Sequence, residues 1–257
     1  MSRRMHQATS QRHDLIAPPE PRRASAYTAG LLALAAWYCL LSLFTFLMFQ
    51  ITAQYWPIRD DVAFLRIKAE YLDIWPWKIA FFIHVFTSLF ALAAGFTQFA
   101  PGLLRKWPVG HRWVGRIYVA DVVLVTGPAS LIMAFFANGG ITSRAAFTVL
   151  SALWISTTAI AYRAIRRRRW KEHRDWMMRS YALTLSAITL RLWKLGLVWM
   201  FHPNPMDVYR VVAWLGFVPN LLLAEWLIRR GSKASLRKLS ARSVSDMAAA
   251  GKTSSHR

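Results

Sequence analysis

The feature that most constrains the fold of this chain is a series of six long apolar stretches. A helix needs about 20 predominantly apolar residues to cross the roughly 30 Å of hydrocarbon in a bilayer. The stretches cover 28–53, 79–100, 114–137, 145–164, 177–200 and 210–229. They lack the alternation of transmembrane β-strands, and only helices or closed barrels satisfy their backbone polar groups in lipid. The sequence therefore predicts an all-α, multi-pass bundle of six transmembrane helices.

The distribution of positive charge predicts the orientation of this bundle. The formal net charge is +21, which in a less apolar chain would suggest nucleic-acid binding. Here 25 Lys and Arg residues lie in or beside the two tails and the loops on one side, and 6 lie on the other side. Positive residues accumulate on the cytoplasmic side of membrane proteins. We therefore expect both termini in the cytoplasm and no nucleic-acid partner.

The same pattern divides the chain into three regions. Residues 1–26 form a basic cytoplasmic tail, residues 27–230 form the six-helix domain, and residues 231–257 form a Ser- and Lys-rich tail predicted to be disordered. The outer loop 54–78 is long enough for a short interfacial helix. Residues that can kink a helix occur in the third and sixth spans: Gly127-Pro128, Gly216 and Pro219.

Polar side chains inside the second and fifth helices fall on single faces, at about 100° per residue. Around His84, the face of the second helix carries the polar or small residues Thr87, Ser88, Gly95 and Gln98. The face of the fifth helix, extended back to His173, carries Ser180, Thr184 and Arg191. Both faces are expected to turn into the bundle, where they either pack against neighbouring helices or line a functional site.

Ionisable residues within the apolar stretches usually pair with one another or line a functional cavity. Arg191 lies far from either end of its helix, so its side chain cannot easily reach the membrane surface. Asp121 is the carboxylate deepest in the membrane, and Glu225 lies nearer the cytoplasmic end of the sixth helix. Because Arg191 belongs to the outer half and Asp121 to the inner half, Arg116 or Arg179 is the better predicted partner for Asp121.

Two cytoplasmic helix entrances carry similar motifs. One is H-R-W-V-G-R-I-Y, beginning at His111, and the other is H-R-D-W-M-M-R-S-Y, beginning at His173. Each places an Arg and a Tyr at nearly equal offsets and opens a helix on the same membrane face. The predicted site at this end of the bundle comprises His111, Arg112, Arg116, His173 and Arg179, with Asp121 as a candidate further member. So many cations would repel one another without an accompanying anion or cofactor.

The combination of motifs resembles a known family. The segment G-F-T-Q-F beginning at Gly95, the two His-Arg motifs and the following Arg191 are similar to a bacterial family of predicted membrane proteins, domain-of-unknown-function family 2306. The resemblance covers the centre of the chain, from His84 to Arg191. It implies a multi-pass protein of a bacterial inner membrane and no particular activity, because no function is established for the family.

Two classes of function remain compatible with these residues. The first is a membrane redox protein that binds haem b or a quinone at the cytoplasmic-side histidines, since a haem between helices needs two histidines at one depth. His84 is a further candidate in this class, although only the loop residue His202 is available as its outer partner. The second is a transporter, or a protein that interacts with anionic lipid head groups, using the polar faces of helices two and five.

Three other interpretations receive less weight. A metal site of His111, His173 and Asp121 is less favoured than haem or quinone, and we predict no metal. The motifs can also be purely structural, with Arg and His meeting lipid phosphates and aromatic rings lying at the interface. No nucleophile, base and acid occur at the spacing of a hydrolase, so the sequence leaves open whether the protein is an enzyme. The oligomeric state is equally undetermined.

Overall fold

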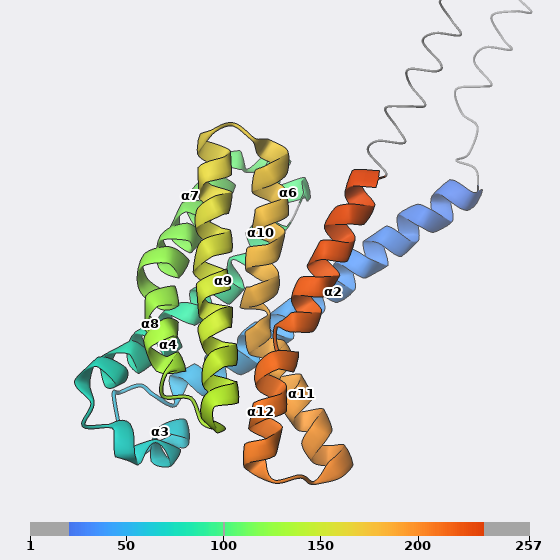
Figure 1. Ribbon diagram of the computed structural model, residues 1–257. Coiled ribbons are helices and arrows are strands. Elements are labelled where there is room, and N and C mark those ends of the chain that lie inside the picture. Colours follow the sequence, from blue (N-terminus) through green and yellow to red (C-terminus); the bar gives the residue numbers. More distant parts are fainter. Residues whose placement is uncertain (1–20, 100, 234–257) are drawn as a thin grey trace, which may run out of the picture. The chain divides into compact units, whose positions relative to one another are not determined.

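The computed structural model describes residues 21–99 and 101–233, and all regular structure in these residues is helical (Figure 1). Six helical segments are long and apolar enough to cross a membrane, namely Gly30–Ala53, Trp75–Gln98, Pro108–Ala134, Gly140–Arg166, Trp170–Phe201 and Pro205–Lys233. The six predicted spans are therefore confirmed. The second to sixth begin several residues before the apolar stretch that predicts them. Most of the two predicted tails lies outside the described residues.

The chain divides into two units, residues 1–44 and 45–257. In the first unit the described residues belong to helix α2 (Pro21–Ala53), which is continuous over 33 residues and ends within the second unit. Leucine side chains along this part of α2, such as Leu32 and Leu40, are exposed. An apolar helix with exposed leucines is suited to a lipid environment, where its backbone hydrogen bonds are satisfied internally.

The second unit contains the other five spans. Its helices are α4 (Trp75–Ala93), α5 (Gly95–Gln98), α6 (Pro101–Lys106), α7 (Pro108–Ala120), α8 (Thr126–Ala134), α9 (Gly140–Arg166), α10 (Trp170–Thr184), α11 (Ser186–Phe201), α12 (Pro205–Leu215) and a last segment over 218–233. Helix α9 packs against α8, α10 and α12, and α4 packs against α8. In Figure 1 the α8–α9 and α11–α12 connections lie at one end of this unit and the α9–α10 turn lies at the other. Successive spans therefore run antiparallel.

Breaks in the helices follow local chemistry. The third span contains a π-helical turn, η3 (Asp121–Val125), immediately before Gly127-Pro128, because proline has no N–H to continue the hydrogen-bond ladder. A Cβ on Gly127 would lie 2.1 Å from the Val122 carbonyl oxygen, so this bend requires glycine. The sixth span is likewise interrupted at Gly216, as predicted. The break in the fifth span at Leu185 was not predicted.

The predicted interfacial segment between the first two spans forms two short helical turns, α3 (Ala63–Ile67) and η2 (Ala69–Tyr71). It is held by a buried aromatic cluster whose core is Tyr55, Leu65, Trp77 and Phe81. Lys68 is buried in this segment, donates to the Phe136 carbonyl and lies 4.4 Å from the centroid of the Tyr71 ring. This burial lowers the pKa of Lys68.

Candidate functional site

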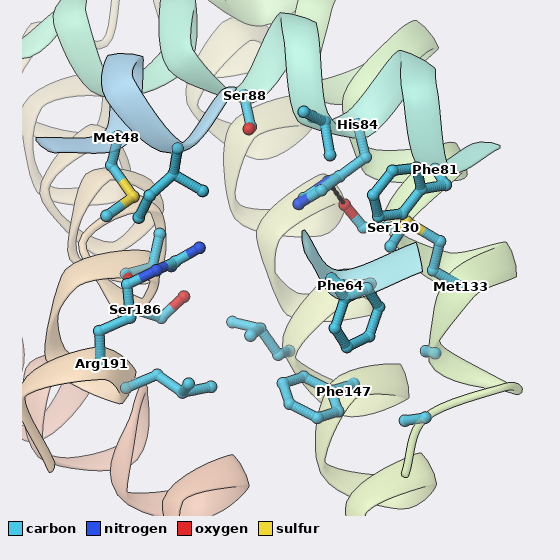
Figure 2. Close-up of a pocket in the computed structure, with 18 of the residues that line it drawn as sticks. Met48, Phe64, Phe81, His84, Ser88, Ser130, Met133, Phe147, Ser186 and Arg191 are labelled. Carbon is cyan, nitrogen blue, oxygen red and sulfur yellow. Dashed lines mark hydrogen bonds between the residues drawn. The ribbon is translucent and has the colours of Figure 1, made fainter. Parts of the chain in front are cut away.

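A cavity of about 450 Å³ opens between the helices of the second unit. Its walls come from α4, α8, α9 and the α10–α11 span, and it is completed by the end of α2, the α3 segment and Tyr209 of α12. Most of the lining is apolar or aromatic, as with Phe81, Met133 and Phe147 (Figure 2). Apolar walls with a few convergent polar groups are typical of small-molecule sites.

The polar faces predicted on the second and fifth helices meet at this cavity. His84 and Ser88 line it from α4, and Ser186 and Arg191 line it from α11. Figure 2 shows the imidazole of His84 and the guanidinium of Arg191 projecting into it from facing walls. The sequence alone did not identify Ser130, which α8 contributes beside His84.

The charged residues that line the cavity are all cations: Lys68, Arg191 and Lys194. Within the described part of the chain, no Asp or Glu lines it. The Lys68 ammonium group already donates to the Phe136 carbonyl. Arg191, in contrast, donates only to the Ala187 carbonyl one turn earlier in its own helix, and no carboxylate among the described residues forms an ion pair with it. The cavity is therefore electropositive, with one guanidinium available to a ligand.

His84 is held by Ser130 of the third span. Its Nδ1 lies 2.8 Å from Ser130 Oγ, which in turn donates to the Thr126 carbonyl at 2.7 Å. Ser130 and Thr126 lie just beyond the π-helical turn. The irregular backbone of this span thus places the polar atoms that orient the imidazole, which is a frequent role of π-helical turns at functional sites.

The predicted partner of Asp121 was wrong. Asp121 Oδ1 accepts a hydrogen bond from Thr126, and its Oδ2 has no partner among the described residues. Arg179 forms a bidentate ion pair with Glu225, with Nη2 3.1 Å from Oε2. Arg116 lies over the Trp113 ring, with its Cζ 5.4 Å from the ring centroid.

Part of the fifth-helix polar face is used in a buried packing network, of which Thr184 also lines the cavity. Tyr118 Oη lies 2.7 Å from Ser180 Oγ and 2.9 Å from Thr184 Oγ1. Trp154 Nε1 donates to Thr184 at 3.0 Å, and Thr158 Oγ1 lies 2.6 Å from Ser180 Oγ. All five side chains are buried, so their polar atoms need these partners. Tyr118, from the first His-Arg motif, thereby joins three helices.

The second His-Arg motif and the G-F-T-Q-F segment meet in a similar contact. Tyr181 donates to the Leu92 carbonyl at 2.7 Å. A Cβ on Gly95 would lie 1.8 Å from Tyr181 Oη, so glycine is required for the tyrosine to reach α4. Gln98, also from this segment, donates to the His111 carbonyl at 3.3 Å. These motif residues therefore fix how the helices pack beside the cavity, since Leu92 also lines it.

The predicted cytoplasmic-side site is only partly assembled by these contacts. His111 and His173 are close enough to interact electrostatically. His173 Nδ1 lies 2.9 Å from the Ala161 carbonyl, whereas the buried Nδ1 of His111 has no partner among the described residues. Arg112 is exposed, and over 21–99 and 101–233 no three potential metal ligands gather. A shared ligand site at these histidines remains a prediction.

Most of the cavity lining and both His-Arg motifs fall in the part of the chain that matches a family of known sequences. The profile of a family described as "Predicted membrane protein (DUF2306)" matches residues 81–228, more than half of the chain. No curated protein and no solved structure matches the chain. With six spans confirmed, and with the match extending from α4 to the last helix, the chain belongs to the DUF2306 family of predicted integral membrane proteins.

Proposed function

We propose that this protein binds an amphipathic anion within the membrane, as a carrier or receptor for that molecule. The observation on which this rests is Arg191, a cation that projects into an apolar cavity without a carboxylate partner among the described residues. An ionisable group kept inside the membrane usually marks a ligand or ion site, because its burial is costly. A guanidinium binds carboxylate and phosphate groups through paired hydrogen bonds, and the aromatic walls suit an alkyl chain.

Binding to defined probes tests this function. The full-length protein in nanodiscs is titrated with dodecanoate, dodecyl phosphate and the neutral analogue dodecanol, and binding to empty nanodiscs is subtracted. We expect at least one of the anions to bind about 10-fold more tightly than dodecanol, because a charge-assisted hydrogen bond contributes about 1.5–3 kcal/mol. The two anions distinguish a carboxylate from a phosphate head group.

Two variants locate the site. Arg191→Gln should bind the anions no more tightly than dodecanol, whereas Arg105→Gln, at an exposed position outside the cavity lining, should keep the wild-type preference. Equal binding of anions and dodecanol by the wild-type protein would refute the proposed function. A preference that survives in Arg191→Gln would place the anion elsewhere.

We further propose that both termini are cytoplasmic and that the cavity belongs to the outer half of a bacterial inner membrane. The Lys and Arg asymmetry supports this orientation, and the antiparallel spans are compatible with it. Reporter fusions that end near Asp73, Gly140 and Pro205 should report an external location. A cytoplasmic report at Gly140 would contradict the topology.

A second candidate function, haem or quinone binding at the proposed cytoplasmic end, is supported by two observations at His111. His111 has a buried ring nitrogen without a partner among the described residues, and it interacts electrostatically with His173. Haem would give the purified protein a Soret band that shifts when dithionite is added. A colourless protein would refute haem. A quinone-dependent signal that is unchanged when both histidines are replaced by Ala would refute quinone binding there.

A further inference from the structure

The hydrogen bonds around His84 define which of its ring nitrogens carries a proton. Ser130 has a single hydroxyl hydrogen, and its Oγ lies 2.7 Å from the Thr126 carbonyl oxygen, an atom that can only accept. The Ser130 hydrogen is therefore committed to that carbonyl. Consequently the 2.8 Å contact between Ser130 Oγ and His84 Nδ1 requires Nδ1–H to be the donor.

The other ring nitrogen of His84, Nε2, is then an acceptor in the neutral ring. Figure 2 shows it directed away from Ser130 and into the cavity. Among the described residues, the hydrogen bond of the His84 ring is the one made by Nδ1 to Ser130. A second proton on this ring would place one more positive charge beside Arg191 and Lys194, and no described carboxylate lines the cavity to compensate it. The neutral ring therefore fits the unliganded cavity.

The cavity thus presents two complementary recognition groups in an apolar surrounding. One wall offers the donors of Arg191, and the facing wall offers the acceptor Nε2 of His84. The other titratable groups of the lining supply no carboxylate acceptor; they are Lys68, Lys194, Tyr55 and Tyr209. A buried acceptor left unpaired on binding would weaken the complex, so the site favours a ligand that satisfies it.

We propose that the ligand of this cavity is a hydroxylated amphipathic anion, whose hydroxyl donates to His84 Nε2 while its anionic group meets Arg191. This inference rests on the proposed function, because it assumes that an anion occupies the cavity. It adds a specificity that Arg191 alone would not give, namely a preference for the hydroxylated compound over the plain alkyl anion of the same length.

The test uses the full chain in nanodiscs and the positional isomers of hydroxydodecanoate, with dodecanoate as reference. At least one isomer is expected to bind about 10-fold more tightly than dodecanoate, the scale of one satisfied buried hydrogen bond. Its methyl ether, which keeps the oxygen and loses the donor hydrogen, should fall to the level of dodecanoate. His84→Asn, which can still donate to Ser130 but lacks Nε2, should bind the hydroxylated isomer no more tightly than it binds dodecanoate.

The possible failures are distinguishable. If dodecanoate binds in an Arg191-dependent way but no hydroxylated isomer binds more tightly, His84 does not select a donor and this inference is overturned while the proposed function stands. If the methyl ether binds as tightly as the alcohol, His84 acts as a donor and the inference is equally overturned. If neither dodecanoate nor any hydroxylated isomer shows Arg191-dependent binding, the proposed function fails as well. His84→Gln is the matched control: its longer side chain can bring an amide oxygen toward the position of Nε2, so it should retain part of the preference for the hydroxylated isomer.

Discussion

Replacing Arg191 by methionine should stabilise the unliganded protein while abolishing anion binding. A guanidinium at the centre of a membrane helix costs about 2.5–3.5 kcal/mol on insertion scales. In this structure the cost is smaller, because Arg191 keeps a hydrogen bond to the Ala187 carbonyl and its side chain is exposed to the cavity. We therefore expect Arg191→Met to raise the free energy of unfolding by about 1–2 kcal/mol.

Arg210, on α12, provides a matched control. Arg210 donates to Asp207 at 3.1 Å and to the Gly139 carbonyl at 3.1 Å. Arg210→Met should therefore lower the free energy of unfolding by about 0.5–1.5 kcal/mol, the scale of the hydrogen bonds lost. The two substitutions remove the same charge and are predicted to act in opposite directions.

The assay is thermal unfolding of the purified protein in one detergent, with and without saturating dodecanoate. A change of about 1 kcal/mol shifts the midpoint by roughly 2–4 °C in a chain of this size. Dodecanoate should raise the midpoint of the wild-type protein, because a ligand that binds only the folded state stabilises it, and should leave that of Arg191→Met unchanged. If Arg191→Met is less stable than wild type by as much as Arg210→Met, Arg191 has a structural role and the argument from its missing partner is wrong.

Three further predictions concern the packing around the cavity. Tyr118→Phe should lower the free energy of unfolding by about 1–3 kcal/mol in the same thermal assay, because the buried hydroxyls of Ser180 and Thr184 each lose a hydrogen-bond partner. An unchanged free energy of unfolding would show that water replaces the tyrosine hydroxyl. Gly95→Ala should lower the free energy of unfolding by about 1–3 kcal/mol, because its added Cβ overpacks against Tyr181. The control Gly196→Ala, with nothing within 4 Å of its added Cβ, should be neutral or slightly stabilising. Equal thermal midpoints for the two variants would contradict this. Burial lowers the pKa of Lys68 below its usual 10.5, so the unfolded chain keeps the Lys68 proton to higher pH than the folded protein does. The free energy of unfolding should therefore rise with pH between the lowered pKa and 10.5. This rise should be smaller in Lys68→Met, and an identical pH profile in the variant would show that Lys68 does not cause it.

Local features of the sequence were sufficient to predict the spans and the interruptions of the third and sixth of them. The number and order of the helices follow from apolar length, because a backbone in lipid has no other way to satisfy its hydrogen bonds. The irregular turn of the third span follows from Pro128, which lacks an N–H at one position. The inward orientation of His84 was also predictable, because angular position along a helix depends only on residue spacing.

Partners across helices were not predictable in the same way. Asp121 was expected near an arginine, but Thr126 of the adjoining turn is its partner, and the expected Arg179 pairs instead with Glu225. Depth in the membrane narrows which groups can meet, yet it does not specify the rotation of each helix about its axis or the neighbour it faces. Those are set by side-chain packing, as where Gly95 admits Tyr181.

The sequence by itself determined a six-helix membrane protein with polar faces on its second and fifth spans, because hydrophobic length and helical periodicity are local properties. Only the tertiary structure decided that His84 and Arg191 face one cavity while Ser180 of the same predicted face is used in a buried network. The break at Leu185 separates the helix that bears Ser180 from the one that bears Arg191. Ser130, which assigns the proton on His84, comes from a third helix, and a contact between separate helices depends on how they pack rather than on any spacing within one of them.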